Sequence, residues 1–318
     1  MSFDPAVFRP EAIDPETAAI NDQIAMAIAA GVPFHQREPA AIRAEMDVAG
    51  PLGPVTRDPD AQDRTIRGPT GEIPIRVLLP ESQPRGVYLH FHGGGFMLGK
   101  PFHSDAPNRE ITKEVGVAVV SVNYRLAPEH KYPAGWDDCE AAARWLVANA
   151  RAEFGTDALL IGGGSAGAQL SANVLLRMRD RHGYTGWRGA NLVYGAYFIG
   201  SPSQRAAAND PIIPTATIDW FQENMLAGPV DVLAPDLSAL FADLRSLPPA
   251  LFTVGTRDPL LDDSMFMYAR WIAAGNKADL RIYPGGIHGF DQLPINIAKT
   301  ARAKMHEFLR ESLAEPAA

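Results

Sequence analysis

The chain has 318 residues, of which 46% are hydrophobic and 21% charged, a composition that predicts a globular protein with a sizeable core. Its formal net charge is −8, which disfavours nucleic acid as a partner because phosphate backbones attract basic surfaces. The single cysteine excludes an intrachain disulfide, and no apolar run approaches the roughly 18 residues that a membrane-spanning helix needs.

The first 50 residues are predicted to be helical and are interrupted by prolines. Ile20, Ile24 and Ile28 recur at positions i, i+4 and i+8, so they give a helix one apolar face. A short segment cannot bury such a face by itself, and we expect it to lie over another part of the protein. The beginning of the chain lacks the charged and apolar regions of a signal peptide, so we expect a cytoplasmic protein.

Strands and helices alternate from about residue 64 onward. Apolar runs that end in Pro or Gly predict strands at residues 73–79, 86–91, 117–122, 158–161, 190–194, 250–254 and 280–283. Helical periodicity predicts helices at about 136–150, 166–179, 262–273 and 297–309. The alternation predicts an α/β fold with a mostly parallel sheet, and residues 200–230 interrupt it as an insertion after a strand.

The stretch LLIGGGSAGAQL at residues 159–170 matches two loop patterns. Gly162, Gly164 and Gly167 fit the G-x-G-x-x-G loop that binds a dinucleotide. Gly163, Ser165 and Gly167 fit the G-x-S-x-G turn that presents a nucleophilic serine. Both patterns require a strand before the turn and a helix after it, so other residues must decide between them.

The dinucleotide interpretation requires an acidic residue about 20 positions further on, at the end of a second strand. Asp180 lies at about that distance, but it belongs to a charged helix end rather than to a strand end. The requirement is therefore not met, and a nicotinamide-dependent dehydrogenase is disfavoured.

The nucleophile interpretation requires a base and a group that orients the base, because an unactivated serine hydroxyl is a poor nucleophile. Asp258 follows the predicted strand at 250–254, and His288, flanked by glycines, follows the strand at 280–283. The order Ser, Asp, His, each after a strand, is typical of α/β-hydrolases. We therefore predict a catalytic triad of Ser165, His288 and Asp258.

An oxyanion hole is predicted at the loop that follows the strand at 86–91. The motif HGGG begins there at His92, and its glycines allow backbone N–H groups to approach a substrate. The expected donors are Gly93, Gly94 and Ala166. His90 shares a strand face with His92, but no third ligand at a recognisable spacing supports a metal site, and no cofactor is expected.

Together these motifs make the sequence resemble the bacterial hormone-sensitive-lipase-like carboxylesterases, a branch of the α/β-hydrolases. The resemblance rests on HGGGF at 92–96, YRLAPEHKYPA at 124–134, GGSAG at 163–167, DPL at 258–260 and HGF at 288–290. It implies an eight-stranded, mostly parallel sheet in a catalytic domain at 51–318, with a helical cap from residues 1–50 and an insertion near 200–230. It also implies structural roles for His92, Tyr124, Arg125 and Glu129, which would brace the oxyanion loop.

The function that the resemblance implies is a serine carboxylesterase that hydrolyses short- to medium-chain acyl esters through an acyl-enzyme intermediate. An amidase or a lactonase with the same triad remains an alternative, because these motifs serve acyl transfer generally. A non-catalytic binding module would be expected to lack a triad member, and none is missing. The expected partner is a small-molecule ester, with no nucleic acid or membrane, and the protein is expected to be a monomer or a homodimer.

Two features stay open at this point. Many relatives carry an acidic residue or threonine immediately before the nucleophile, whereas this chain has Gly164. A substrate pocket could be lined by apolar residues near the oxyanion loop, after a strand end and in the insertion, although each could equally be packing. These candidates are Phe96, Met97, Leu98, Tyr197, Phe198, Trp220 and Phe221.

Overall fold

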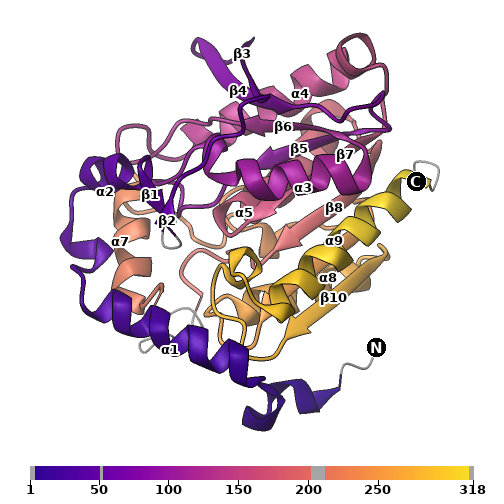
Figure 1. Ribbon diagram of the computed structural model, residues 1–318. Helices are drawn as coiled ribbons and strands as arrows, with labels where there is room; N and C mark the ends of the chain where they lie inside the picture. Colours follow the sequence, from indigo (N-terminus) through magenta and orange to yellow (C-terminus); the bar gives the residue numbers. More distant parts are fainter. Residues whose placement is uncertain (1–3, 51–52, 202–211, 315–318) are drawn as a thin grey trace.

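Within residues 4–50, 53–201 and 212–314, which the computed structural model describes, eight strands form one sheet at the centre of the protein (Figure 1). The strand order is β10-β9-β8-β7-β5-β6-β4-β3. The strands are β3 (Gln62–Arg67), β4 (Glu72–Leu78), β5 (Val87–Phe91), β6 (Ala118–Val122), β7 (Leu159–Gly164), β8 (Trp187–Val193), β9 (Ala250–Gly255) and β10 (Ala278–Tyr283). A separate antiparallel pair joins β1 (Ala49–Gly50) to β2 (Gly53–Pro54).

The predicted mostly parallel sheet is confirmed. Strands β6, β5, β7, β8, β9 and β10 run parallel, and only β4 and β3 are antiparallel to their neighbours. The sequences VYLHF of β5 and AVVSV of β6 are buried along their whole length, as expected of strands covered on both faces. Strand β3 was not predicted, because QDRTIR is polar and buries only Ile66 at the edge of the sheet.

Helices cover both faces of the sheet. Helix α3 (Asp105–Val115) contacts α9 (Asn296–Ala314) on one face, and α4 (Ala134–Phe154) contacts α5 (Ala166–His182) on the other. Helix α8 (Leu261–Ala273) packs on β9 and β10. Among the described helices, none is both long and apolar enough to cross a membrane. Helix α3 was not predicted, because its polar sequence DAPNREITKEV carries only a few apolar residues on its buried face.

The N-terminal segment differs from its predicted apolar face. Helix α1 (Pro15–Ala29) buries the polar side chains of Thr17 and Asn21, whereas Ile28 is 40% exposed. Asn21 donates a hydrogen bond of 2.8 Å to the carbonyl of Gly285, so a polar contact helps to anchor the helix. The predicted apolar face was therefore wrong for Ile28. The face of α1 that packs against the rest of the protein is narrower than its three isoleucines suggest.

Four further elements lie with α1 on the side of the sheet where the parallel strands end (Figure 1). They are η3 (Phe34–Gln36), α2 (Pro39–Met46), α7 (Thr215–Met225) and the β1–β2 pair. Element η3 contacts α7, so the N-terminal segment and the predicted insertion meet. Residues 202–211 of the insertion lie outside the described residues. That α1, η3, α2 and α7 act as one cap, with a boundary near residue 50, stays a prediction.

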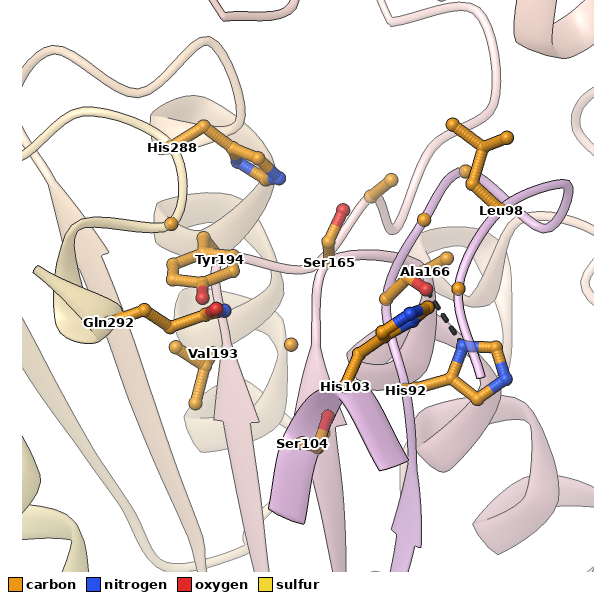
Figure 2. Close-up of a pocket in the computed structure, with 18 of the residues that line it drawn as sticks. His92, Leu98, His103, Ser104, Ser165, Ala166, Val193, Tyr194, His288 and Gln292 are labelled. Atoms are coloured by element: carbon orange, nitrogen blue, oxygen red, sulfur yellow. Dashed lines mark hydrogen bonds between the residues drawn. The ribbon is translucent and has the colours of Figure 1, made fainter. Parts of the chain in front are cut away.

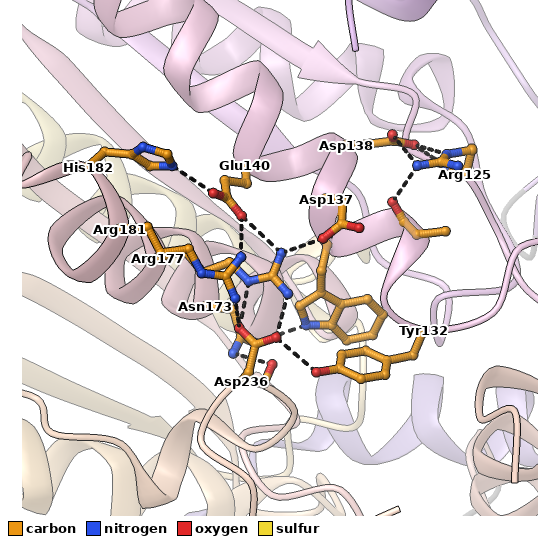
Figure 3. A network of polar contacts seen from close by, with 12 residues as sticks. Arg125, Tyr132, Asp137, Asp138, Glu140, Asn173, Arg177, Arg181, His182 and Asp236 are labelled. Carbon is orange, nitrogen blue, oxygen red and sulfur yellow. Dashed lines mark hydrogen bonds and ion pairs between the residues drawn. The ribbon is translucent and has the colours of Figure 1, made fainter. Parts of the chain in front are cut away.

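A charged network fixes α5 to α4 and to the loop at Asp236 (Figure 3). The guanidinium of Arg177 binds Asp236 at 2.5 and 2.6 Å, Asp137 at 2.9 Å and Glu140 at 3.1 Å. The Arg177 side chain is 3% exposed, so it is the buried centre of the network. Arg181, one turn further along α5, binds Glu140 and Asp236 from the surface and is 46% exposed.

The two arginines are expected to differ in their contribution to stability. Arg177→Ala should lower the free energy of unfolding by about 2–4 kcal/mol, because it removes the only buried cation among three carboxylates. Arg181→Ala, which shares two of those partners, should cost less than about 1 kcal/mol because its ion pairs are exposed to solvent. Urea unfolding of both variants measures this difference, and equal losses would contradict the assignment of Arg177 as the centre.

Candidate active site

Ser165 lies at the sharp turn between β7 and α5. Its backbone has φ 56° and ψ −121°, a left-handed conformation that is costly for any residue other than glycine. Its N–H donates to the carbonyl of Val193 at 2.9 Å, and its carbonyl accepts the N–H groups of Ala168 and Gln169. Strand β8 and the first turn of α5 therefore both hold the backbone in this strained conformation.

Two glycines make the turn sterically possible. A Cβ atom on Gly163 would lie 2.1 Å from the carbonyl oxygen of Phe91, and one on Gly167 would lie 1.9 Å from the same atom. No real Cβ approaches an oxygen so closely. The G-x-S-x-G spacing thus lets β5, β7 and the start of α5 converge on one carbonyl group.

Asp258 and His288 form a pair beside the turn. Asp258 follows β9, its side chain is fully buried, and its Oδ1 accepts the N–H of Leu260 at 2.8 Å. Nδ1 of His288 lies 3.1 Å from Oδ1 and 3.0 Å from Oδ2 of Asp258. His288 and Ser165 line the same pocket (Figure 2), and Asp258 belongs to this site through its contact with His288.

The predicted oxyanion loop folds back over the turn. Gly94 has φ 115°, and its carbonyl accepts the N–H groups of Met97 at 3.1 Å and Leu98 at 2.8 Å. Gly93 packs against the backbone of Gly164, which lies next to Ser165. Within the described part of the chain, no acceptor is found for the N–H groups of Gly93, Gly94 and Ala166. These three donors are therefore available to a ligand.

The residues that were expected to brace this loop do so in different ways. The Tyr124 hydroxyl donates to the carbonyl of His92 at 2.7 Å, and the two rings stack with centroids 4.3 Å apart. Arg125 instead binds Asp138 of α4 at 2.8 and 2.9 Å. Tyr124 thus supports the loop directly, whereas Arg125 anchors the segment that carries Tyr124.

Glu129 reaches the loop through a residue that the sequence analysis did not identify. Arg43, in α2, binds both carboxylate oxygens of Glu129 at 2.9 Å and donates to the carbonyl of Met97 at 2.7 Å. It also donates to the carbonyl of Ala127 at 2.5 Å. This hydrogen bonding lowers the pKa of Glu129. No local pattern marks Arg43, because its partners lie more than 50 residues away in sequence.

A mainly apolar pocket of about 400 Å³ opens onto Ser165. Of the seven predicted pocket residues, Phe96, Leu98 and Phe221 line it. The Phe221 ring packs so tightly on the oxyanion loop that a Cβ on Gly95 would lie 2.4 Å from it. The prediction differs from the structure for the other four residues, which do not line this pocket. These are Met97, Tyr197, Phe198 and Trp220.

Further lining residues come from segments that carry no recognisable motif. Phe34 and Met46 belong to the N-terminal segment, and Ile218 and Met225 belong to α7. They reach the pocket only because those elements fold over the ends of the strands. Apolar spacing within a short helix cannot distinguish a residue that lines a pocket from one that fills a core, so sequence reasoning could not find them.

Two histidines, His90 in β5 and His92 at the start of the predicted oxyanion loop, are buried in neutral form. Burial lowers the pKa of His90 to about 3 and of His92 to about 4. Nδ1 of His90 lies 2.8 Å from the hydroxyl of Ser121, and Nδ1 of His92 lies 2.9 Å from the carbonyl of Gly93. The described residues contain no group of three His, Cys, Asp or Glu side chains that could hold a metal ion.

Comparison with known proteins places this geometry in a family. The alpha/beta hydrolase fold family matches residues 88–292 of the chain. The carboxylic ester hydrolase LipN of Mycobacterium tuberculosis is 37% identical over 241 residues, which make up 73% of this chain and 64% of LipN. The chain thus spans just under two thirds of LipN. Esterase LipI of the same organism is 33% identical over 256 residues, or 76% of this chain and 78% of LipI.

Solved structures agree with the sequence comparison. An ester hydrolase from the metagenome of Lake Arreo, in complex with a derivative of bipyridine phosphonate, has a TM-score of 0.83 and 31% identity. The match covers 95% of this chain and 98% of that one. The fold class that was predicted from the sequence is confirmed by these similarities.

The buried histidines predict how stability depends on pH. In the unfolded chain their pKa takes its ordinary value of about 6.5, so below that pH the unfolded state binds protons that the folded state excludes. The stability that the two neutral histidines contribute to the folded state is complete above about pH 6.5. As the pH falls below this value, the free energy of unfolding decreases by up to about 1.4 kcal/mol per pH unit for each histidine. Urea unfolding at pH 7 and pH 5 should therefore show a clear loss of stability.

His90→Asn should weaken this pH dependence without abolishing it, because burial also lowers the pKa of His92, His103 and His306. The matched control is His130→Gln, since His130 is exposed on the surface. For each protein, the quantity compared is the difference in the free energy of unfolding between pH 7 and pH 5. This difference corrects for any loss of stability that the substitution causes at both pH values. An unchanged pH dependence in His90→Asn would argue against proton uptake by this residue.

Proposed function

Because the chain belongs to the α/β-hydrolase fold family, in its hormone-sensitive-lipase-like branch, we propose that it is a serine carboxylesterase. Ser165 is the nucleophile, His288 the base and Asp258 the residue that orients the base. The substrates are short- to medium-chain acyl esters. The similar proteins that are named as ester hydrolases and esterases support this proposal.

The observation that carries the proposal is the pairing of His288 with a fully buried carboxylate beside the strained Ser165 turn. Both oxygens of Asp258 lie within 3.1 Å of Nδ1 of His288. A proton on Nδ1 satisfies this contact, which leaves Nε2 as the acceptor on the opposite side of the ring. The imidazole is thereby held in the tautomer that can take the proton of a serine hydroxyl.

The reaction follows from these assignments. Nε2 of His288 accepts the hydroxyl proton while Ser165 Oγ attacks the ester carbonyl carbon and forms a tetrahedral intermediate. The intermediate collapses, His288 returns the proton to the leaving alcohol, and an acyl-enzyme remains. Water, activated by the same imidazole, then adds to the acyl carbon, and the acid is released with Ser165 restored.

Stabilisation of the oxyanion falls to backbone groups. The N–H groups of Gly93, Gly94 and Ala166 have no acceptor among the described residues, and a developing negative charge can bind them. Ala166 is also the first residue of α5, so the positive end of the helix dipole faces the same position. The loop is already held by Tyr124 and Arg43, and the donors therefore need little rearrangement during the reaction.

The preference for short or medium acyl chains is supported by the size and lining of the pocket. A volume of about 400 Å³ lies at the small end of the range for ligand pockets and would hold an ester of modest length. The aromatic rings of Phe34, Phe96 and Phe221 and the aliphatic chains of α7 favour an apolar substrate.

Substitution of the nucleophile tests the assignment. Ser165→Ala should lower kcat by at least about 10⁴-fold on a p-nitrophenyl ester, because no other group can form the acyl-enzyme. A p-nitrophenyl alkylphosphonate should label the unsubstituted protein at Ser165, as peptide mapping will identify. Ser171→Ala, which removes a buried hydroxyl from the same helix, is the control and should keep both turnover and labelling. Labelling at another residue would refute the proposal.

The pH dependence of turnover tests the base. On the acid side of the profile kcat/KM should fall as the pH is lowered, because a protonated His288 cannot accept a proton. His90 and His92, whose pKa values are lowered to about 3 and about 4, remain neutral over this range and cannot cause the decline. Initial rates between pH 5 and 9 measure the profile, and a flat profile would exclude an imidazole base.

A further inference from the structure

The glycine before the nucleophile faces an aromatic ring. A Cβ atom on Gly164 would lie 3.1 Å from Cε2, 3.3 Å from the hydroxyl oxygen and 3.4 Å from Cζ of Tyr194. A separation of 3.1 Å is closer than nine in ten real Cβ contacts. The Tyr194 ring therefore lies against the backbone of residue 164 and leaves hardly enough room for a methyl group.

Tyr194 is held firmly in this place. It follows β8, it is 3% exposed, and its backbone has φ 38°, which is unusual for a residue other than glycine. Its N–H donates to the carbonyl of Thr253 at 2.7 Å, while the preceding carbonyl, of Val193, accepts the N–H of Ser165. The same strand end thus fixes both the tyrosine and the serine turn.

The ring also contacts the imidazole of His288. The two ring centroids are 4.7 Å apart and their planes are inclined by 58°. Figure 2 shows the tyrosine ring beside the imidazole, within the pocket that Ser165 also lines. Asp258 holds Nδ1 of His288, and the tyrosine ring adds a contact to the imidazole ring itself. An aromatic ring packed against the imidazole restricts its tilt.

A hydrogen bond anchors the far end of the tyrosine. Its hydroxyl donates to Oδ1 of Asp291 at 2.5 Å. Asp291 lies three residues after His288, in η6 (Phe290–Gln292), so the bond joins the end of β8 to the loop that carries the histidine. Burial raises the pKa of Tyr194 well above its ordinary value, and the hydroxyl consequently remains a donor.

We propose that Tyr194 is a positioning residue for His288, that Asp291 anchors it, and that Gly164 is the space that the tyrosine requires. The inference rests on the proposed role of His288 as the base. Tyr194 does not exchange protons with the substrate. Its ring supports the imidazole from the side while Asp258 holds it at Nδ1. The side chain that supports the base therefore comes from the residue after β8, and it occupies the place where a side chain on residue 164 would otherwise lie.

Substitutions of Tyr194 and Asp291 test the support. Tyr194→Leu should lower kcat on a p-nitrophenyl ester by about 30–100-fold, and Tyr194→Phe by about 5–10-fold, because small displacements of a catalytic group are costly. KM should stay within about twofold in both variants, since the ground state does not depend on the orientation of the base. Tyr184→Phe, whose ring packs on Trp187 away from the site, is the control and should match the unsubstituted protein.

The anchor can be tested by rescue. Asp291→Ala should reproduce the loss seen in Tyr194→Phe, because both remove the same hydrogen bond. Asp291→Asn retains an acceptor oxygen and should recover kcat to within about threefold of the unsubstituted protein. Equal losses in the alanine and asparagine variants would overturn the assignment of Asp291 as the anchor.

A double-mutant cycle tests the link to Gly164. Gly164→Ala should lower kcat by about 5–10-fold in the unsubstituted protein, because the methyl group displaces the tyrosine ring. In the Tyr194→Leu background the same substitution should change kcat by less than about twofold, because the ring is no longer there to be displaced. Additive effects of the two substitutions would overturn the proposal that they share one space.

Two comparisons separate this inference from the proposed function. If Ser165→Ala abolishes turnover but Tyr194→Leu and Tyr194→Phe keep the kcat of the unsubstituted protein, only the inference fails. If the phosphonate labels a residue other than Ser165, the proposed function fails as well. Urea unfolding checks that each variant is folded. Should Tyr194→Leu not fold, Tyr194→Phe and the two Asp291 variants decide the question.

Discussion

The site depends on the convergence of three backbone segments at one carbonyl group. The carbonyl oxygen of Phe91, at the end of β5, lies where the side chains of residues 163 and 167 would otherwise be. Because both are glycine, β7 and α5 can approach β5, and Ser165 is forced into its left-handed conformation between them. The predicted oxyanion loop starts directly after Phe91, so the proposed nucleophile and its expected donors are placed by the same close contact.

Much of this arrangement could be predicted from the sequence. Continuous apolar runs marked the central strands, and the spacing of GGSAG, Asp258 and His288 predicted that they meet at the strand ends. Strand β3 and helix α3 could not be predicted, because long-range ion pairs hold them. Arg76 of β4 binds Asp63 of β3 and Asp105 at the start of α3, each at 2.7–2.8 Å. Pairs of this kind leave no periodicity in the sequence.

The support of the site was predictable only in part. Motif residues such as Tyr124 could be assigned a structural role, but their partners came from distant segments, as Arg43 shows. The same reason explains why four of the seven predicted pocket residues were misplaced. These residues lie near the site residues in the sequence. The direction of each side chain, however, depends on how the complete fold packs. The sequence marks Gly164 as a departure from the family pattern, but only the structure shows that Tyr194 faces it.

Arg43 has a consequence for the way such a protein can diverge. One guanidinium joins α2 of the N-terminal segment to the carbonyl of Met97 in the predicted oxyanion loop and to Glu129. The N-terminal segment, which lines the pocket at Ser165, thus also holds the predicted oxyanion loop through Arg43. If relatives exchanged this segment, the geometry of the loop would change together with the shape of the pocket. Substrate selectivity and reaction rate would then change together.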